Sequence, residues 1–295
     1  MMRLIKIYTG ILLWLFAGNL LADQKIPFEL PRSEVISIPD RKNDRVYEIH
    51  IQLPAKYQED KKYPVVYMTD SPYTFPIVTG AARYPVNNER MRDVMFVGIS
   101  WQTGYSPAAS RRRDYTPTVD ALWANDPAAE ADKHLEFIRN EVIPYIDTRF
   151  STEITNRTYV GNSLGGLFGF YILLNNPYLF KNYVIGSPSV WWGEKHILAA
   201  EAKTKLPADL AVNIFIAVGA DEIPGRDSPK NDMVGQAREM FDRLKARDLK
   251  NSKFEMRVIE HANHATAFPV TSAQGLWWLF NNDTGDKRGV ANPAP

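Results

Sequence analysis

The stretch that decides the fold is Tyr159-Val160-Gly161-Asn162-Ser163-Leu164-Gly165-Gly166. A short apolar run leads into a serine with glycine two positions before and two positions after it, and a helical pattern follows over residues 164–174. Glycines at these positions remove side chains that would collide across a sharp turn between a strand and a helix. Such a turn places the Ser163 hydroxyl at a helix N-terminus, where backbone N–H groups favour negative charge. Ser163 is therefore a candidate nucleophile, and the alternative is an ordinary glycine-rich turn.

Apolar patterns on both sides of this turn predict a mainly parallel sheet. Residues 45–53 alternate in polarity, as in a strand with one buried face, and the continuous apolar runs 65–68 and 94–99 suit strands buried on both faces. Further strands are expected at 159–160, 183–185, 212–218 and 254–259, and helices at 127–142, 164–174, 233–249 and 273–280. This order predicts an α/β fold in which helices cover both faces of a mostly parallel central sheet.

A serine nucleophile needs a base within hydrogen-bond reach. In α/β-hydrolases, whose nucleophile elbow has this Gly-x-Ser-x-Gly pattern, the chain order is serine, acid, histidine. The histidines that follow Ser163 are His196, His261 and His264. His196 lies on a segment expected at the surface, and His261 directly follows the last predicted strand, where a structural role is expected. His264 lies further into the following loop, so it is the favoured base, with His261 as the alternative.

The acid is expected after the strand at 212–218, where Asp221 and Glu222 follow in sequence. Either carboxylate could orient the imidazole and stabilise its charged form. Adjacent loop residues point in different directions, so only one of them is expected to do so. The other would be a solvated loop charge, for example a partner of Arg226.

Two backbone N–H groups are expected to stabilise the oxyanion of the reaction. One is that of Leu164, directly after the serine, and the other comes from the loop 69–73 behind an apolar strand. Pro72 has no N–H, so the second donor is expected to be Ser71 or Tyr73.

The first 22 residues have the layout of a secretory signal peptide. Arg3 and Lys6 give a positive start, residues 11–16 are apolar, and Ala22 offers a cleavage point. The apolar run is short for a membrane span, although an uncleaved N-terminal anchor is the alternative. We therefore expect a periplasmic or secreted protein with no membrane association after cleavage.

The mature chain is expected to comprise a hydrolase domain over residues 23–282 and a flexible tail over residues 283–295. Removing residues 1–22 removes two of 35 basic residues and none of 34 acidic residues, so the formal net charge changes from +1 to −1. This balance gives no electrostatic reason to expect nucleic acid as a partner. The chain has no cysteine, no phosphate-binding loop and no cluster with metal-ligand spacing, so we expect no cofactor and no metal.

Five segments, taken in order, resemble the putative esterase family of α/β-hydrolases that includes esterase D, feruloyl esterases and ferric-siderophore esterases. They are Tyr67-Met68-Thr69-Asp70-Ser71, Arg113-Asp114-Tyr115-Thr116-Pro117, residues 137–150, Gly161-Asn162-Ser163-Leu164-Gly165-Gly166 and Ser187-Pro188-Ser189-Val190-Trp191-Trp192. The last resembles the Ser-Pro-Ser-x-Trp-Trp segment of the siderophore branch, which includes periplasmic trilactone esterases. Ser71 stands where the family usually has glycine.

The resemblance implies a serine esterase with Ser163 as nucleophile and His264 as base. The residues 219–222 are similar to the family's Gly-x-x-Glu, which implies Glu222 rather than Asp221 as the acid. Some siderophore esterases use a Ser–His dyad without an essential acid, and such a dyad is the alternative to a triad with Glu222.

Four residues are candidate substrate contacts: Trp191, Trp192, Arg113 and Tyr73. The tryptophans would form a wall for an aromatic or acyl group, and the alternative for them is core packing. One of Arg111, Arg112 and Arg113 would receive an anionic or iron-loaded substrate through its guanidinium, with Arg113 as the candidate. The alternatives are a solvated loop for all three and a structural pair of Arg113 with Asp114. The substrate is expected to be a small-molecule ester. An acyltransferase that uses the same serine and histidine, and a non-catalytic siderophore-binding protein, are the rival functions.

Overall fold

The computed structural model describes residues 28–126, 129–227 and 230–282. The expected signal peptide, residues 1–22, and the expected tail, residues 283–295, lie outside the described residues. The described chain forms an eight-stranded sheet whose strands are β1 (Ser33–Asp40), β2 (Arg45–Gln52), β3 (Tyr63–Met68), β4 (Met95–Gln102), β5 (Thr152–Asn162), β6 (Asn182–Gly186), β7 (Asn213–Gly219) and β8 (Lys253–Ile259).

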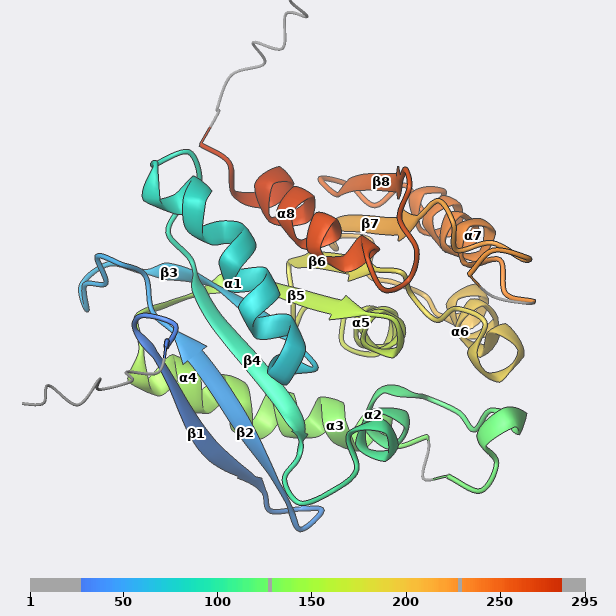
Figure 1. Cartoon of the computed structure of the whole chain (residues 1–295), viewed down its shortest axis with the longest axis horizontal. Helices are drawn as coiled ribbons and strands as arrows, with labels where there is room; N and C mark the ends of the chain where they lie inside the picture. Colours follow the sequence, from blue (N-terminus) through green and yellow to red (C-terminus); the bar gives the residue numbers. More distant parts are fainter. Residues whose placement is uncertain (1–27, 127–128, 228–229, 283–295) are drawn as a thin grey trace, which may run out of the picture.

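The sheet is mostly parallel, as the sequence predicts. Its strands lie in the order β1-β2-β4-β3-β5-β6-β7-β8 (Figure 1). The pairs β1–β2 and β2–β4 are antiparallel, whereas every pair from β4–β3 to β7–β8 is parallel. In open α/β sheets, ligands bind outside the carboxyl ends of the parallel strands. The turn at Ser163 and the loops that follow β6, β7 and β8 lie at this edge.

Helices cover both faces of the sheet (Figure 1). Helices α1 and α8 pack together on one face, where Phe75, Val78, Phe268 and Leu276 belong to the same apolar cluster as Val66 of β3. Helices α3 to α7 lie on the other side, over a second and larger apolar cluster. The helices are α1 (Ser71–Asn87), α2 (Pro107–Tyr115), η1 (Ala121–Trp123), α3 (Ala131–Phe137), η2 (Ile138–Val142), α4 (Ile143–Arg149), α5 (Leu164–Asn175), α6 (Trp192–Lys203), α7 (Met233–Lys245) and α8 (Ala267–Phe280).

Helix α1 is the main departure from the sequence prediction. The residues 69–73 are predicted to form a loop, but α1 begins at Ser71. Pro72 lies in its first turn, where a missing N–H has no cost, because the first N–H groups of a helix have no intrahelical acceptor. Pro76 and Pro85 lie further along the helix and interrupt the pattern by which a helix is recognised from sequence.

The helix predicted over 127–142 is wrong in its bounds. Within the described residues, α3 begins at Ala131, and the helical path continues through the π-type turn η2 and α4 as far as Arg149. Pro144 lies in the first turn of α4, and since it lacks an N–H, a wider turn ahead of it accommodates the missing bond. The helix predicted over 273–280 begins earlier, at Ala267.

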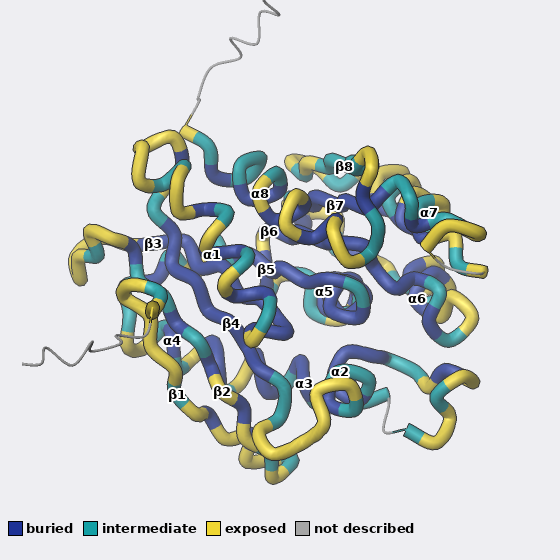
Figure 2. The backbone as a smooth tube through the Cα atoms, in the orientation of Figure 1, coloured by how far each residue is buried: buried dark blue, intermediate teal, exposed yellow. Residues whose placement is uncertain are grey.

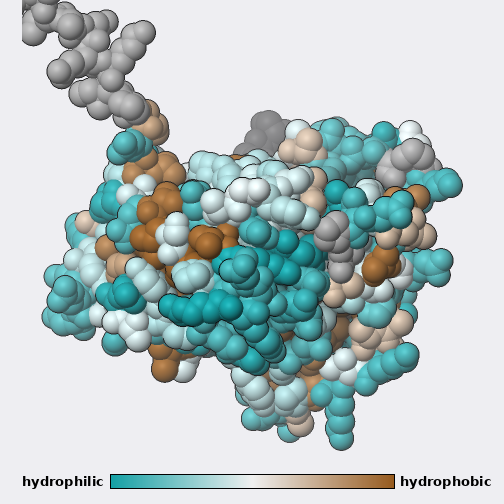
Figure 3. All heavy atoms as spheres, turned by 90° about the horizontal axis from the view of Figure 1, so that it is seen from below, coloured by the Kyte–Doolittle hydropathy of each residue, from teal (hydrophilic) through white to brown (hydrophobic). Residues whose placement is uncertain are grey.

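The central strands are buried on both faces, whereas β1 at the edge is largely exposed (Figure 2). Figure 3 shows a face that is mainly hydrophilic, with hydrophobic residues in separate patches rather than in one continuous surface. None of the helices in the described part of the chain has the length and apolar character needed to cross a membrane.

Candidate active site

Ser163 lies at the sharp turn between β5 and α5, as the sequence predicts. Its backbone has φ 59° and ψ −118°, a conformation that non-glycine residues seldom adopt. A Cβ atom at Gly161 would lie 2.3 Å from the Gly165 carbonyl oxygen, and one at Gly165 would lie 2.6 Å from Thr69 Oγ1. Both glycines are therefore required for the turn to close. Ser163 N donates to the Gly186 carbonyl over 2.9 Å, which ties the turn to β6.

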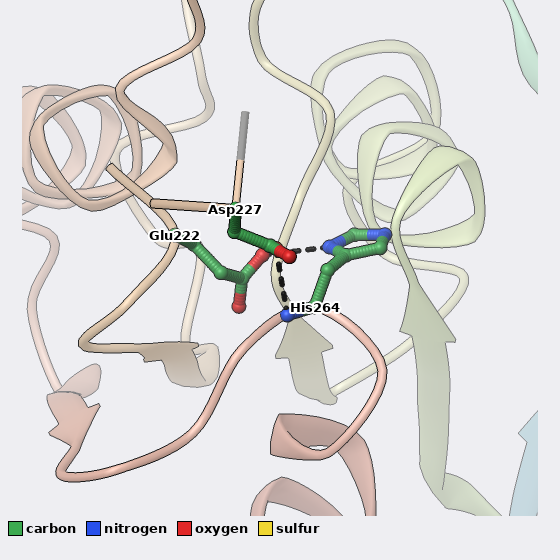
Figure 4. Close-up of side chains that lie close together, drawn as sticks. All are labelled: Glu222, Asp227 and His264. Carbon is green, nitrogen blue, oxygen red and sulfur yellow. Dashed lines mark hydrogen bonds and ion pairs between the residues drawn. The ribbon is translucent and has the colours of Figure 1, made fainter. Parts of the chain in front are cut away.

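Glu222 and His264 meet beyond the carboxyl ends of β7 and β8 (Figure 4). Glu222 Oε2 lies 2.6 Å from His264 Nδ1. The other oxygen, Oε1, accepts hydrogen bonds from Gly219 N at 2.7 Å and from Ser187 Oγ at 2.5 Å. The carboxylate is fully buried, and a buried charge needs such partners. Because Nδ1 is engaged with Glu222, Nε2 is the nitrogen of His264 that is left to act on a substrate or nucleophile.

Asp221 does not share this contact. Its Oδ1 lies 2.5 Å from Arg226 Nη1, in an ion pair at the surface. The structure therefore brings Glu222, rather than its neighbour, to the imidazole. This is the arrangement implied by the family resemblance, with Asp221 in the surface pairing considered as its alternative.

Asp227 was not among the residues singled out from the sequence. Its Oδ2 accepts a hydrogen bond from the backbone N–H of His264 over 2.9 Å (Figure 4). The two residues lie 37 positions apart, on different loops, so no local pattern could have linked them.

Ligand atoms of Glu222, Asp227 and His264 lie within 4.8 Å of one another, so these residues could in principle hold a metal ion. Glu222 and Asp227 lie on the loop between β7 and α7, and His264 lies on the loop after β8, so the three residues form no local pattern in the sequence. Their proximity is accounted for by the bonds that His264 makes through Nδ1 and through its backbone N–H.

The other two histidines that follow Ser163 are exposed. His196 lies on α6, and His261 occupies a turn at φ 57° after β8. Ser163 Oγ has Ser189 Oγ at 3.2 Å as its hydrogen-bond partner, and among the described residues no bond joins it to His264. Catalytic hydrogen bonds are often long or unformed in a free enzyme and tighten when substrate binds.

The residues 69–73, of which Ser71 to Tyr73 belong to the first turn of α1, lie beside the turn at Ser163. Asp70 has φ 58°, its N–H donates to Tyr115 Oη over 3.2 Å, and its carbonyl accepts from Tyr73 N over 3.1 Å. Since Tyr73 N is engaged and Pro72 has none, Ser71 N is the remaining donor of the two considered from the sequence. Leu164 N is likewise at the first position of a helix, where N–H groups have no intrahelical acceptor.

The side chain of Ser71 fills space that the sheet leaves for it. Its Oγ lies 2.8 Å from His50 Nδ1 on β2. A Cβ atom at Gly98 on β4 would lie only 2.6 Å from Ser71 Cβ, so glycine at that position makes room for the serine. Burial lowers the pKa of His50, which favours a neutral ring that can bond to the hydroxyl.

The Asp70 carboxylate is fully buried and is held by three side chains. Arg111 binds it through Nε at 2.7 Å and Nη2 at 3.2 Å, Trp101 Nε1 donates over 2.6 Å, and Tyr73 Oη donates over 3.2 Å. Burial raises the pKa of Tyr73, and the Asp70 charge raises it further, so the phenol keeps the proton that it donates. Arg111 was considered from the sequence only as a possible anion receptor, and its pairing with Asp70 was missed.

Arg113 is buried, with 7% of its surface exposed. Its Nε donates to Asp114 Oδ1 over 2.8 Å, and its other nitrogens donate to Gln102 Oε1 at 2.7 Å and to Tyr47 Oη at 3.2 Å. This placement favours the structural pair with Asp114 over contact with a substrate.

The two consecutive tryptophans differ in their surroundings. Trp192 is 2% exposed, stacks on Trp123 with ring centroids 5.2 Å apart, and donates through Nε1 to the Thr118 carbonyl over 2.7 Å. It therefore packs in the core and anchors the segment that contains η1. Trp191 is only half-buried, 5.8 Å from Trp123, and is the one of the pair with surface left for a ligand.

Known proteins resemble this chain along most of its length. The family described as "Putative esterase" matches residues 42–268. The ferri-bacillibactin esterase BesA of Bacillus subtilis is 27% identical over 274 residues, which are 87% of this chain and 92% of that protein. The siderophore triacetylfusarinine C esterase of Aspergillus fumigatus is 28% identical over 256 residues, 82% of each chain.

Solved structures give the same answer for the fold. The crystal structure of BES protein from Bacillus cereus has a TM-score of 0.74 and 27% identity, and covers 87% of this chain and 97% of its own. The siderophore hydrolase EstA from Aspergillus nidulans has a TM-score of 0.72 at 20% identity, over 86% and 97% of the two chains. The chain therefore has the α/β-hydrolase fold, belongs to the "Putative esterase" family and is an enzyme that hydrolyses ester bonds.

Proposed function

We propose that the chain is a siderophore esterase that cleaves the ester bonds of a siderophore, such as a trilactone, through an acyl-enzyme at Ser163. The observation that carries this is the buried Glu222–His264 pair, which lies at the same edge of the sheet as the strained serine. Relatives named as esterases of bacillibactin and triacetylfusarinine C support the substrate class.

In this mechanism, Ser163 Oγ attacks the ester carbonyl while His264 Nε2 takes its proton. Glu222 holds the ring through Nδ1 and stabilises the imidazolium that forms. His264 then gives the proton to the leaving alcohol, and water activated by the same ring releases the acid from the serine.

The tetrahedral oxyanion would be stabilised by the N–H groups of Leu164 and Ser71. Each such donor typically supplies about 3–4 kcal/mol of transition-state stabilisation. Ser71 is well suited to the role because Asp70, held by Arg111, and His50 fix the backbone and the side chain on either side of its N–H.

The substrate would contact Trp191 and Tyr73 beside the serine, while Trp192 and Arg113 support the surrounding segment from the core. We further propose that residues 1–22 are a signal peptide and that the enzyme works in the periplasm or outside the cell.

The test is hydrolysis of an ester panel by the purified protein: a short p-nitrophenyl ester, a feruloyl sugar, a ferric hydroxamate ester and a ferric catecholate trilactone. We expect the highest kcat/KM on a siderophore and no activity on any ester after Ser163→Ala. If the simple ester is preferred, the substrate class is wrong while the serine mechanism stands. If the Ser163→Ala protein keeps activity, the mechanism itself is wrong.

A further inference from the structure

The turn formed by Ser187, Pro188 and Ser189 lies between the two halves of the proposed triad. It leaves the carboxyl end of β6, and β6 lies in the sheet between β5 and β7. β5 leads directly to Ser163, and β7 leads to the loop that carries Glu222. The turn is therefore flanked by the nucleophile on one side and by the acid on the other.

On the acid side, Ser187 holds Glu222. Its Oγ donates to Glu222 Oε1 over 2.5 Å, and the two residues are 0% and 1% exposed. Ser187 N donates to the Ala217 carbonyl over 2.8 Å, which attaches the turn to β7. With Oε1 taken by Ser187 and Gly219 N, Oε2 is the oxygen that faces His264.

The backbone of Ser187 has an unusual conformation. Its φ of 38° lies in the left-handed region, which non-glycine residues adopt only at an energetic cost. Such a conformation persists where the surrounding structure fixes it, and it is common at active sites.

On the nucleophile side, Ser189 contacts Ser163 twice. Its Oγ lies 3.2 Å from Ser163 Oγ, and its N–H donates to the Ser163 carbonyl over 3.1 Å. Ser189 is 1% exposed, so solvent does not compete for this hydroxyl. It is the hydrogen-bond partner of the reacting oxygen in the free enzyme.

Pro188 joins the two serines and packs against the helix that follows the nucleophile. A Cβ atom at Gly166 in α5 would lie 3.1 Å from Pro188 Cα and 3.2 Å from Pro188 Cβ. This close approach leaves the turn little freedom to move relative to α5, and the proline ring restricts its backbone further.

We propose that Ser187 and Ser189 are positioning residues of the catalytic site, one for Glu222 and the other for the Ser163 hydroxyl. The inference rests on the proposed function. During attack the Ser163 proton passes to His264, so Ser189 keeps its own proton and can donate to the oxygen throughout. Ser187 acts through the acid, because it fixes the carboxylate that orients the ring.

The test compares Ser187→Ala and Ser189→Ala with Ser272→Ala as a matched control. Ser272 is also fully buried, but its Oγ donates to the Phe268 carbonyl within α8, over 2.9 Å. We expect kcat on a short p-nitrophenyl ester to fall about tenfold for each site variant, with KM within about twofold. The rate at which a fluorophosphonate labels Ser163 should fall by a similar factor, and Ser272→Ala should leave kcat, KM and the labelling rate unchanged.

Two further variants distinguish a role of the Ser187 hydroxyl in holding Glu222 from an effect of the substitution on folding. Ser187→Gly removes the same hydroxyl but tolerates the positive φ, so it should fold at least as well as Ser187→Ala and lose as much kcat. In a Glu222→Gln background, Ser187→Ala should add little to the loss, because its effect passes through that carboxylate.

Wild-type kcat and labelling in both site variants, with Ser163→Ala inactive, would overturn this inference and leave the proposed function intact. Activity that survives Ser163→Ala would instead remove the proposed function. If Ser187→Gly recovers the wild-type rate, the loss in Ser187→Ala comes from backbone strain, and the role given to the hydroxyl is wrong.

Discussion

Two regions of the molecule meet at Ser163, and the sequence reveals them very differently. The loops after β7 and β8 supply Glu222 and His264, and the order of strands along the chain points to both of these loops. The segment from β3 to α3 supplies the start of α1 at Ser71 and the Asp70–Arg111 pair, a contact that the sequence does not predict. The difference shows that a sheet edge can be predicted from sequence, whereas a side-chain network between distant helices cannot.

The largest effect is expected in the first region, from His264→Ala. Loss of the proposed base should lower kcat by roughly 10⁴-fold or more, because the serine then has no group to take its proton. His261→Ala is the matched control, since that histidine is exposed in the turn just before. Steady-state hydrolysis of a p-nitrophenyl ester measures both, and a larger loss in the His261 variant would show that the base has been misplaced.

The acid gives the next largest effect. Glu222→Gln keeps the shape but weakens the hold on the imidazolium, so kcat should fall by about 10²–10⁴-fold. Asp221→Asn removes only a surface ion pair with Arg226, and its kcat should stay within about twofold. Small losses in both variants would support a Ser–His dyad in place of a triad.

This first region was predictable because its residues follow directly from the chain order. The glycines at 161 and 165 fix the turn at Ser163, and the proposed acid and base are then expected beyond the next strands of a parallel sheet. The chain order does not decide which carboxylate of 221 and 222 turns inward, and only the family resemblance favours Glu222. That choice depends on the donors Gly219 N and Ser187 Oγ, which only the folded loop brings together.

The second region was hidden for physical reasons. Three prolines obscure α1, so Asp70 was read as a loop residue and not as the residue that precedes a helix. Its partner Arg111 lies 41 positions later, on a helix with no apolar stripe of its own. The tryptophans show the same limit, because identical neighbours in sequence have different burial.

Arg111→Met tests how much the side chains around Asp70 contribute to stability and to kcat. It leaves the fully buried Asp70 carboxylate without its cation, and we expect the free energy of unfolding to fall by about 3 kcal/mol. The kcat should fall as well, because Ser71 adjoins Asp70. Arg112→Met is the matched control: its partner Asp126 is 36% exposed, so the cost should stay below about 1 kcal/mol.

Urea unfolding of the two arginine variants gives these free energies directly. Adding Asp70→Asn to Arg111→Met should recover part of the lost stability, because it neutralises the stranded charge. If Arg111→Met and Arg112→Met lower the free energy of unfolding equally, the burial of the Asp70–Arg111 pair adds nothing to stability. The two regions would then differ only in how well the sequence predicts them.

The smallest effect concerns His134, which packs behind the second region against Tyr115 and Phe168. It is 1% exposed, and neither ring nitrogen has a hydrogen-bond partner among the residues that the structure describes. Burial lowers its pKa, so below about pH 6.5 the unfolded chain binds a proton that the folded chain does not. The free energy of unfolding of the wild type should therefore fall as the pH drops through this range.

His134→Leu removes both the unpaired nitrogens and this proton linkage. At pH 8 the variant should be at least as stable as the wild type, because replacing an unsatisfied polar group with an apolar one of similar size is neutral or favourable.

The difference in free energy of unfolding between the variant and the wild type should grow by about 1 kcal/mol as the pH falls from 7 to 5.5, since each unit of pKa difference is worth about 1.4 kcal/mol. Urea unfolding of the two proteins at several pH values measures this difference. A stability difference that stays constant with pH would mean that His134 titrates alike in the folded and unfolded chain, and that the ring is not isolated from water as its contacts indicate.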